Sequence, residues 1–251
     1  ADLLGIEMID FQAMCCSPKE LFGFAPHPTG FINAGAVFRN EEGEEFLKRY
    51  FPDTAEKSSR SEVILAMAKE IHAGRAGSTG GIYMDATAIP IETIQKQIPH
   101  VYKTCLHRGI DITKTPLEVA PGSHTWLGGL DVDTYGQSSI PGLFAAGETA
   151  GGIHGGNRIG GSALAASLVF GRRAGRKAAE LVGLEPVSVP TLGDNAIPEE
   201  ERNWLSGLME RTEGPFQGDV RMHCRMLAHD KLGPIRDEKT LREALSEYER
   251  I

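Results

Sequence analysis

The stretch Gly142-Leu-Phe-Ala-Ala-Gly-Glu148, continued by Thr149-Ala-Gly-Gly-Ile-His-Gly-Gly-Asn-Arg158-Ile-Gly-Gly-Ser-Ala-Leu164, decides the fold. Its apolar start predicts a short buried strand over 142–147. That strand would deliver the Glu148 carboxylate at its carboxyl end, where open α/β sheets bind ligands. The paired glycines that follow let the backbone approach a ligand closely. They lead into a predicted helix from Ser162 to Leu181, whose first N–H groups favour an electron-rich or anionic ligand. By itself the pattern is typical of a ligand-binding loop or of a tight structural turn.

The residue string is more specific than its glycines. It resembles the closing FAD motif of the fumarate reductase/succinate dehydrogenase flavoproteins, in which AGE precedes HGANRLGG and a helix of small residues. Upstream, Ala120-Pro-Gly-Ser-His124-Thr-Trp-Leu-Gly-Gly129 resembles the family's HYTMGG segment. The segments Gly80–Asp85 and Gly109–Lys114 resemble positions in its capping domain, and residues 220–248 resemble the start of its helical domain. The matched segments follow the family's order and cover most of the chain.

This resemblance implies a mixed fold, α/β plus α+β. It consists of the second half of a split FAD-binding α/β domain, an inserted α+β capping domain and a carboxyl-terminal helical segment. The expected boundaries are 1–11 for the end of the first FAD-domain part, 12–118 for the capping domain, 119–184 for the second FAD-domain part, 185–198 for a proline-rich linker and 199–251 for the helical segment.

Local signals predict individual helices. Ser58 or Ser59 is expected to begin a helix that carries Val63, Met67 and Ile71 on one face and ends at Gly74. Two or three helices are expected after residue 199. Asp237 is expected to cap the last of them, which carries Leu241, Leu245 and Tyr248 on one face.

The G-x-G-x-x-G fingerprint that opens this fold and holds the pyrophosphate does not occur in the 251 residues. The chain also begins at a point that resembles the segment just upstream of the family's capping domain. We therefore expect a carboxyl-terminal part of a longer flavoprotein, which by itself binds little or no FAD. The alternative outside the enzyme class is that the chain is an isolated piece without catalytic activity.

The resemblance also implies site residues. Lys48-Arg-Tyr50-Phe-Pro52 resembles the family's ERY-x-P string, and Arg60 lies at the spacing of the arginine that exchanges a proton with the substrate. His124 and Arg158 match residues that hold a substrate carboxylate, a role that suits an imidazole and a bidentate guanidinium. Arg60, His124 and Arg158 are expected to meet in one cleft.

Further roles are implied around these residues. Asn33, which replaces a family threonine, is assigned to substrate binding, and Glu148, Ser162, Ala163 and Leu164 are assigned to FAD. Other positions depart from the family pattern. Phe11-Gln12-Ala13-Met14 places methionine where relatives have a substrate-binding histidine, and the family's RGEGG string is missing. A His-Pro-Thr-Gly string does occur later, at His27–Gly30, either as a shifted equivalent or by coincidence.

The expected function is therefore an FAD-dependent oxidoreductase that transfers hydride between flavin N5 and a C=C or C–C bond of a small carboxylate. L-Aspartate oxidase and adenylylsulfate reductase chemistry are the alternatives within the same fold. The expected partners are the carboxylate substrate and an iron–sulfur electron-transfer subunit.

Composition narrows the remaining function classes. A formal charge of −8 with no basic stripe argues against a nucleic-acid partner, and no apolar run is long enough to span a membrane. Four cysteines without C-x-x-C spacing (Cys15, Cys16, Cys105 and Cys224) indicate reduced thiols and a cytoplasmic location, with no metal site. A peripheral position at the inner face of the membrane, reached through partner subunits, is the alternative.

Overall fold

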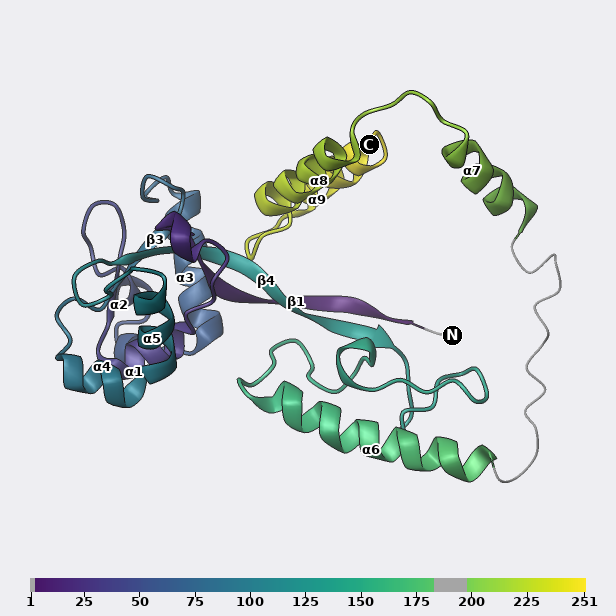
Figure 1. Ribbon diagram of the computed structural model, residues 1–251, viewed down its shortest axis with the longest axis horizontal. Coiled ribbons are helices and arrows are strands. Elements are labelled where there is room, and N and C mark those ends of the chain that lie inside the picture. The colour runs from purple at the N-terminus through teal and green to yellow at the C-terminus, as the bar shows by residue number, and fades with distance from the viewer. Residues whose placement is uncertain (1–2, 183–197) are drawn as a thin grey trace. The chain divides into compact units, whose positions relative to one another are not determined.

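The computed structural model describes residues 3–182 and 198–251 (Figure 1). The described chain divides into two compact units. The first runs to Ala174 and includes Gly233–Arg236, and the second comprises Gly175–Leu232 and Asp237–Ile251. The first unit carries the residues that the sequence assigns to chemistry.

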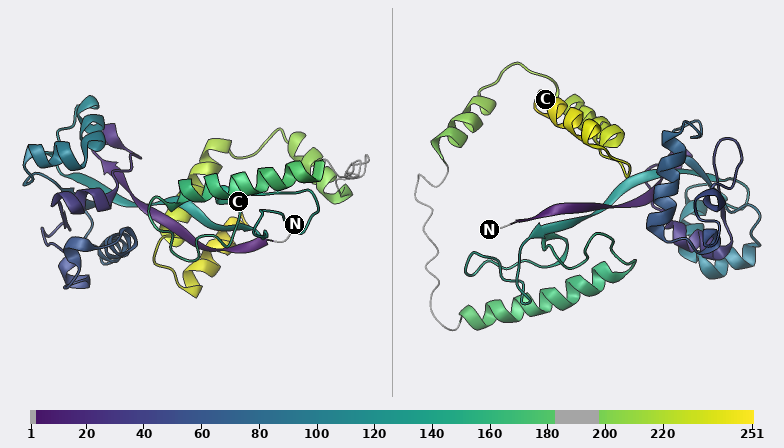
Figure 2. Two further views of the ribbon diagram at one scale, coloured as in Figure 1. Left: turned by 90° about the horizontal axis from the view of Figure 1, so that it is seen from below. Right: turned by 180° about the vertical axis from the view of Figure 1, so that it is seen from behind.

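One antiparallel four-stranded sheet organises the first unit. Its strands lie in the order β1 (Leu3–Ser17), β4 (Leu117–Leu130), β3 (Ile82–Asp85) and β2 (Val37–Arg39). β1 and β4 pair over most of their length as a two-stranded ribbon (Figures 1 and 2). The ribbon extends away from a helical lobe, which also contains β2 and β3. The expected boundaries at residues 12 and 118 both fall within these two strands. The ribbon therefore joins the lobe to the glycine-rich part of the chain. The domain boundaries themselves stay predictions.

Five α-helices surround the short end of the sheet. A 3-10 turn, Lys19–Leu21, precedes them, and a second, Ala55–Lys57, lies between the second and the third. The helices are α1 (Pro28–Ala34), α2 (Leu47–Tyr50), α3 (Arg60–His72), α4 (Ile91–Gln97) and α5 (Pro99–His107). Their apolar faces pack against the sheet in one core, whose largest fully buried side chains include Phe31, Phe38, Phe46, Met67 and Ile82. The large buried apolar area of these side chains is the main stabilising term for the lobe.

Helix α3 begins and ends where the sequence predicts. Ser59 caps it in a capping box with Glu62, in which the Ser59 hydroxyl accepts from the Glu62 N–H and the Glu62 carboxylate accepts from the Ser59 N–H. A cap of this kind contributes about 1 kcal/mol. Val63 and Met67 are fully buried, while Gly74 adopts φ +76°, a left-handed conformation that ends the helix. The capping box fixes the first turn, and so it fixes Arg60.

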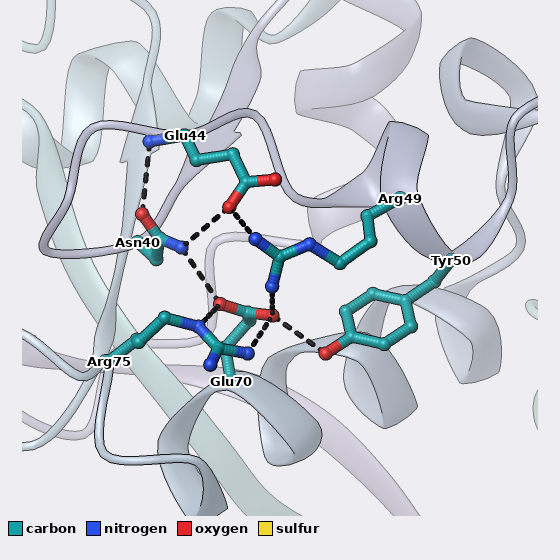
Figure 3. A network of polar contacts seen from close by, with 6 residues as sticks. All are labelled: Asn40, Glu44, Arg49, Tyr50, Glu70 and Arg75. Atoms are coloured by element: carbon teal, nitrogen blue, oxygen red, sulfur yellow. Dashed lines mark hydrogen bonds and ion pairs between the residues drawn. The ribbon is translucent and has the colours of Figure 1, made fainter.

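A buried carboxylate joins α3 to α2 (Figure 3). Glu70 is fully buried and accepts hydrogen bonds from Arg75 Nε at 2.7 Å, Arg75 Nη2 at 2.8 Å, Tyr50 Oη at 2.7 Å, Asn40 Nδ2 at 2.8 Å and Arg49 Nη1 at 3.2 Å. The hydrogen bonds from Arg75, followed by those from Asn40 and Tyr50, lower the pKa of Glu70 from 4.5 to about 2 although burial raises it. Tyr50 ends α2 and Glu70 lies near the end of α3, so this network joins the two helices that flank Arg60 in the sequence.

The predicted strand in the glycine-rich segment is wrong. Residues 142–147 do not form a buried strand: only an isolated bridge joins Phe144 to Gln137, Leu143 is 39% exposed, and Gly147–Thr149 form a 3-10 turn. In the described part of the chain this segment has no neighbouring strand with which to form a ladder, so the apolar run alone cannot make it β structure. The predicted helix is confirmed as α6 (Ser162–Val182).

Three helices follow residue 198, within the range that the sequence predicts: α7 (Glu199–Met209), α8 (Gln217–Lys231) and α9 (Glu238–Tyr248). α8 and α9 pack together, with Lys231 Nζ 2.8 Å from Glu243 Oε2 and Tyr248 Oη donating to the Cys224 carbonyl. Asp237 caps α9 as predicted. The expected linker at 185–198 lies almost wholly outside the described residues, and no described helix is long and apolar enough to cross a membrane.

Candidate active site

A cavity of about 830 Å³ lies in the first unit between the lobe and the glycine-rich segment. Its walls come from β1 and β4, from the starts of α1, α3 and α6, and from the loop over residues 157–161. Arg60, His124 and Arg158 all line it. The structure therefore brings together the three residues that the sequence expects to meet, although 98 positions separate the first from the last.

A β-bulge directs His124 to this cavity. Asp10 pairs with Thr125, and the next residue of β1, Phe11, pairs with Ser123, so His124 is an extra residue in β4 at this point of the ladder. A bulge breaks the alternation of side chains and is a common way of re-aiming one of them at a site. His124 is exposed, while its neighbour Thr125 is buried and also lines the cavity.

The two arginines approach the cavity from opposite elements. Arg60 is half-buried at the first position of α3, and Arg158 is only 5% exposed in the glycine-rich loop. The Asn157 amide donates to the Ser61 hydroxyl at 3.2 Å. Asn157 precedes Arg158 and Ser61 follows Arg60, so this hydrogen bond links the residues next to the two arginines. The contact therefore joins the backbone segments that carry the two arginines.

A second histidine lies at the same cavity. His27 precedes α1 and its Nδ1 lies 3.0 Å from Gln12 Nε2 of β1. The chain returns to β1 before reaching His27, because the Cys15 N–H donates to the Phe24 carbonyl and the Gly23 N–H donates to the Cys15 carbonyl. The fold therefore places the His-Pro-Thr-Gly string beside Gln12, near the strand position where the family resemblance leads one to expect a histidine.

The electrostatics of the cavity favour an anion. Two guanidinium groups and two imidazoles line it, and Glu148 is the only acidic residue among its described lining residues. The first turns of α3 and α6 lie at its edge, and helix amino termini carry partial positive charge. A carboxylate that is removed from water needs cationic partners of this kind.

A smaller cavity of about 110 Å³ adjoins this one. Thr125, Glu148 and Ala163 line both, and the rest of the smaller cavity is made mainly by the glycine-rich backbone around residues 147–155. Glu148 Oε1 accepts from the Trp126 N–H at 2.9 Å, which holds the carboxylate between the two spaces.

The backbone near α6 is open to a bulky ligand. A methyl group added to Gly155, Gly160 or Gly161 would meet no atom within 4 Å. Ser162 and Ala163 are half-buried and Leu164 is 71% exposed in the first turn of α6. An uncovered apolar side chain, a bare glycine backbone and a helix amino terminus together fit a flat, electron-rich cofactor such as a flavin.

Asn33 is not brought to this site. It lies on the exposed side of α1 and lines a different cavity with Lys48 and Lys57. Six residues separate it from His27, and the helix that begins at Pro28 carries it away from the group formed by His27, Arg60, His124 and Arg158. Asn33 is therefore absent from the residues that line the cavity of Arg60 and Arg158, and its assignment to substrate binding stays a prediction.

Sequence reasoning missed Asn157 and left Gln12 and His27 without a role. The intact His-Pro-Thr-Gly string was the available signal for His27, whereas nothing local marks Asn157 as a partner of Ser61. Among residues 3–182 and 198–251, no three histidine, cysteine or acidic side chains gather in a way that would hold a metal ion.

Comparison with known proteins identifies the class. A family model described as "FAD binding domain" matches residues 2–164, so the chain belongs to the FAD binding domain family. Relatives that cover most of the chain include a subunit of a fumarate reductase and the flavoprotein subunit of a succinate dehydrogenase.

Two relatives make the match concrete. One subunit of the CoM/CoB fumarate reductase of Methanothermobacter marburgensis is 37% identical over 262 residues, which cover 98% of this chain and 44% of that protein. An uncharacterized FAD-dependent oxidoreductase of Methanocaldococcus jannaschii is 35% identical over 253 residues, covering 98% of this chain and 45% of that protein. This chain thus spans less than half the length of these relatives.

Solved structures agree on the fold. The Mycobacterium smegmatis Sdh1 complex in its apo form matches with a TM-score of 0.78 and 33% identity, over 99% of this chain and 41% of that one. A quinol-fumarate reductase with menaquinol molecules matches with a TM-score of 0.80 over 97% of this chain and 44% of that one, at 24% identity. The chain is therefore a mixed α/β structure that corresponds to part of these flavoproteins.

Proposed function

We propose that this chain supplies the capping domain and the second half of the FAD-binding domain of an oxidoreductase that acts on a C=C or C–C bond of a small carboxylate. One observation carries the proposal: Arg60, Arg158, His27 and His124 line one cavity, and that cavity shares Thr125, Glu148 and Ala163 with the glycine-lined space beside it. A substrate in the first space would lie directly against a cofactor in the second.

Arg158 and the two histidines would hold the substrate. A buried guanidinium forms a bidentate pair with a carboxylate, and imidazole N–H groups donate to its remaining oxygens. Burial of Arg158 strengthens these interactions because water competes less effectively for the charges. Since His27 and Arg158 come from different elements, a dicarboxylate that engages both ends of the site would be preferred over a monocarboxylate.

Glu148, Ser162, Ala163 and Leu164 would hold FAD. The carboxylate of Glu148 is suited to accept from ribose hydroxyls, and the first turn of α6 presents the positive end of its helix dipole and apolar surface to the rest of the cofactor. When bound, the flavin supplies hydride exchange at N5 with one carbon of the substrate.

Arg60 would exchange a proton with the other carbon of that bond. An arginine is a weak acid, but an enclosed site with a second cation nearby reduces the cost of deprotonating it. The capping box at Ser59 and the Glu70 network hold the segment that carries Arg60, so its geometry is fixed before the substrate binds. An arginine at the positive end of a helix costs stability, which favours a functional reason for its presence.

The remaining assignments follow from the same proposal. Residues 12–118 would act as the cap, 119–184 as the second FAD-domain part and 199–251 as the start of a helical domain. Relatives are named as one subunit of a fumarate reductase and as the flavoprotein subunit of a succinate dehydrogenase, which supports assembly with further subunits. An iron–sulfur subunit would be the electron-transfer partner. The cytoplasmic location expected from the cysteine pattern stays a prediction.

L-Aspartate oxidation is the second candidate. The L-aspartate oxidase of Caulobacter vibrioides is 37% identical over 183 residues, which cover 72% of this chain. Met14 also stands where the family resemblance leads one to expect a substrate-binding histidine, and it does not line the cavity. Both candidates require the same cationic cavity and differ only in the substrate it accepts.

The test uses the full-length protein reconstituted with FAD. Reduction of fumarate by a reduced viologen dye and oxidation of succinate and L-aspartate by an electron-accepting dye would be measured side by side. We expect turnover of one of these dicarboxylates and a KM that rises at least about tenfold in Arg158→Gln, because a charge-assisted pair is lost. Arg221→Gln, an exposed arginine of α8 that does not line the cavity, is the matched control. A flavin-loaded protein that turns over none of the three would overturn the substrate assignment.

A further inference from the structure

Gln12 is a buried residue whose side chain faces the candidate active site. It is 0% exposed, lies opposite Gly122 in the β1–β4 ladder, and lines the cavity that holds Arg60 and Arg158. The only hydrogen-bonding contact of its side chain in the described part of the chain joins Nε2 to His27 Nδ1 at 3.0 Å. Ordering a buried amide side chain costs conformational entropy. The contact between Gln12 and His27 therefore needs an explanation.

His27 is held in a conformation that it would not adopt alone. Its backbone has φ 55° and ψ 83°, and among the described residues it is the only one other than glycine with positive φ. A side chain in this region costs on the order of 1–3 kcal/mol and persists only where the surroundings enforce it. The contacts that hold it there are the return of the preceding loop to Cys15 and the Gln12 side chain.

The burial of Gln12 indicates the direction of this hydrogen bond. With the amide NH₂ beside His27, the atom left without a hydrogen-bond partner is Oε1, an acceptor. The opposite orientation would leave two N–H donors buried without an acceptor, and orphaned donors are rarer in proteins than under-satisfied carbonyl oxygens. Gln12 therefore donates and His27 Nδ1 accepts, which leaves the proton of the neutral imidazole on Nε2.

We propose that Gln12 is a positioning residue that holds His27 as the Nε2–H tautomer, so that a neutral histidine presents a hydrogen-bond donor to the ligand of this cavity. The proposal rests on the proposed function for the identity of that ligand, a carboxylate, but the tautomer itself does not depend on it. Met14, two residues further along β1, cannot supply such a donor. A histidine at the position of Met14 would supply this hydrogen-bond donor from β1 alone. Here Gln12 of β1 and His27, which precedes α1, supply it together.

The primary experiment reads the tautomer directly. The 251-residue chain labelled with ¹⁵N-histidine would be examined by two-bond ¹⁵N–¹H correlation NMR at neutral pH, with His27→Asn identifying the resonances. We expect His27 to show a protonated Nε2 and an unprotonated Nδ1. Gln12→Glu, whose carboxylate can only accept from the ring, should move the proton to Nδ1. An Nδ1–H pattern in the unsubstituted chain, or an unchanged His27 pattern in Gln12→Glu, would overturn the proposal.

A second variant guards against loss of folding. Gln12→Met keeps the volume of the side chain but removes its hydrogen-bonding groups, so the core of the ribbon should remain filled. We expect a mixture of His27 tautomers in this variant, with the resonances of His72 and His107, which do not line the cavity, unshifted. If His27 keeps a pure Nε2–H pattern, Gln12 does not set the tautomer.

Kinetics separate this proposal from the proposed function. In the full-length, FAD-loaded protein, Gln12→Met should raise the KM for the carboxylate substrate by roughly tenfold and leave kcat within about twofold, since the lost contact positions a binding group. Gln12→Asn, whose shorter amide reaches less far, should fall between the two proteins. Absence of turnover in the unsubstituted protein would count against the proposed function alone, because the NMR result stands without it. An unchanged KM in Gln12→Met would count against Gln12 alone.

Discussion

Asn157 Nδ2 donates to Ser61 Oγ across 3.2 Å, although 96 residues separate the two in the sequence. Each is the immediate neighbour of an arginine of the candidate active site, Arg158 and Arg60 respectively. Since one comes from the glycine-rich loop and the other from the first turn of α3, the contact joins two walls of the cavity, and we expect it to hold the spacing of the two arginines.

Removing this contact should weaken substrate binding more than folding. We expect Asn157→Ala to raise the KM of the full-length enzyme about fivefold, because an exposed hydrogen bond contributes about 1 kcal/mol. The melting temperature should change little. Steady-state kinetics and thermal unfolding check this, with Ser246→Ala in α9 as a control that leaves the cavity untouched. A KM equal to that of the unsubstituted enzyme would show that the contact does not set the spacing.

Arg60→Gln should act mainly on kcat. If Arg60 exchanges a proton with the substrate in the transition state, its loss should lower kcat by about 10²–10⁴-fold with a much smaller effect on KM. Hydride transfer measured in a single turnover should slow by the same factor. Near-normal turnover in Arg60→Gln would contradict the proton-exchange role, whereas a rise in KM alone would indicate a binding role.

The Glu70 network predicts a specific acid dependence. The folded-state pKa of about 2 lies below the ordinary value of 4.5, so ionised Glu70 contributes its full stability above about pH 4.5 and loses it as the pH falls toward 2. We expect Glu70→Gln to lose roughly 3 kcal/mol of unfolding free energy at pH 7, since the buried side of the pair with Arg75 loses its charge.

Urea unfolding between pH 2 and 7 measures this effect. The variant should also show a shallower loss of stability between pH 4.5 and 2 than the unsubstituted protein. Glu238→Gln, which removes an exposed ion pair with Arg242 in α9, serves as control and should behave like the unsubstituted protein. Equal acid dependence in Glu70→Gln and the parent would mean that another carboxylate dominates it.

The isolated 251-residue chain should bind little FAD. Glu148 and the first turn of α6 offer only part of the cofactor's contacts, and the sequence has no G-x-G-x-x-G fingerprint for the pyrophosphate. Purification with excess FAD, followed by gel filtration and absorbance at flavin wavelengths, should leave far less than one flavin per chain, while the full-length protein should retain it. A yellow isolated chain with near-stoichiometric flavin would refute this expectation.

The sequence by itself determined the elements whose signals are local. Ser59 with Glu62 specifies the start of α3, Gly74 specifies its end, and Asp237 caps α9 because a side-chain acceptor, a left-handed glycine and a turn of backbone interact within four residues. The sequence also identified Arg158 from the motif around it and Arg60 from its spacing after Tyr50. Both residues line the cavity. The predicted strand at 142–147 failed because a strand depends on neighbours that an apolar run does not supply.

Only the tertiary structure decided how the site is assembled. The return of the chain to Cys15 carries His27 to Gln12, the extra residue in the β1–β4 ladder falls at His124, and the length of α1 takes Asn33 elsewhere. None of these is a property of a residue or its near neighbours. Each follows from how distant backbone segments pair their hydrogen-bonding groups, and such pairings are selected by the free energy of the whole packed unit.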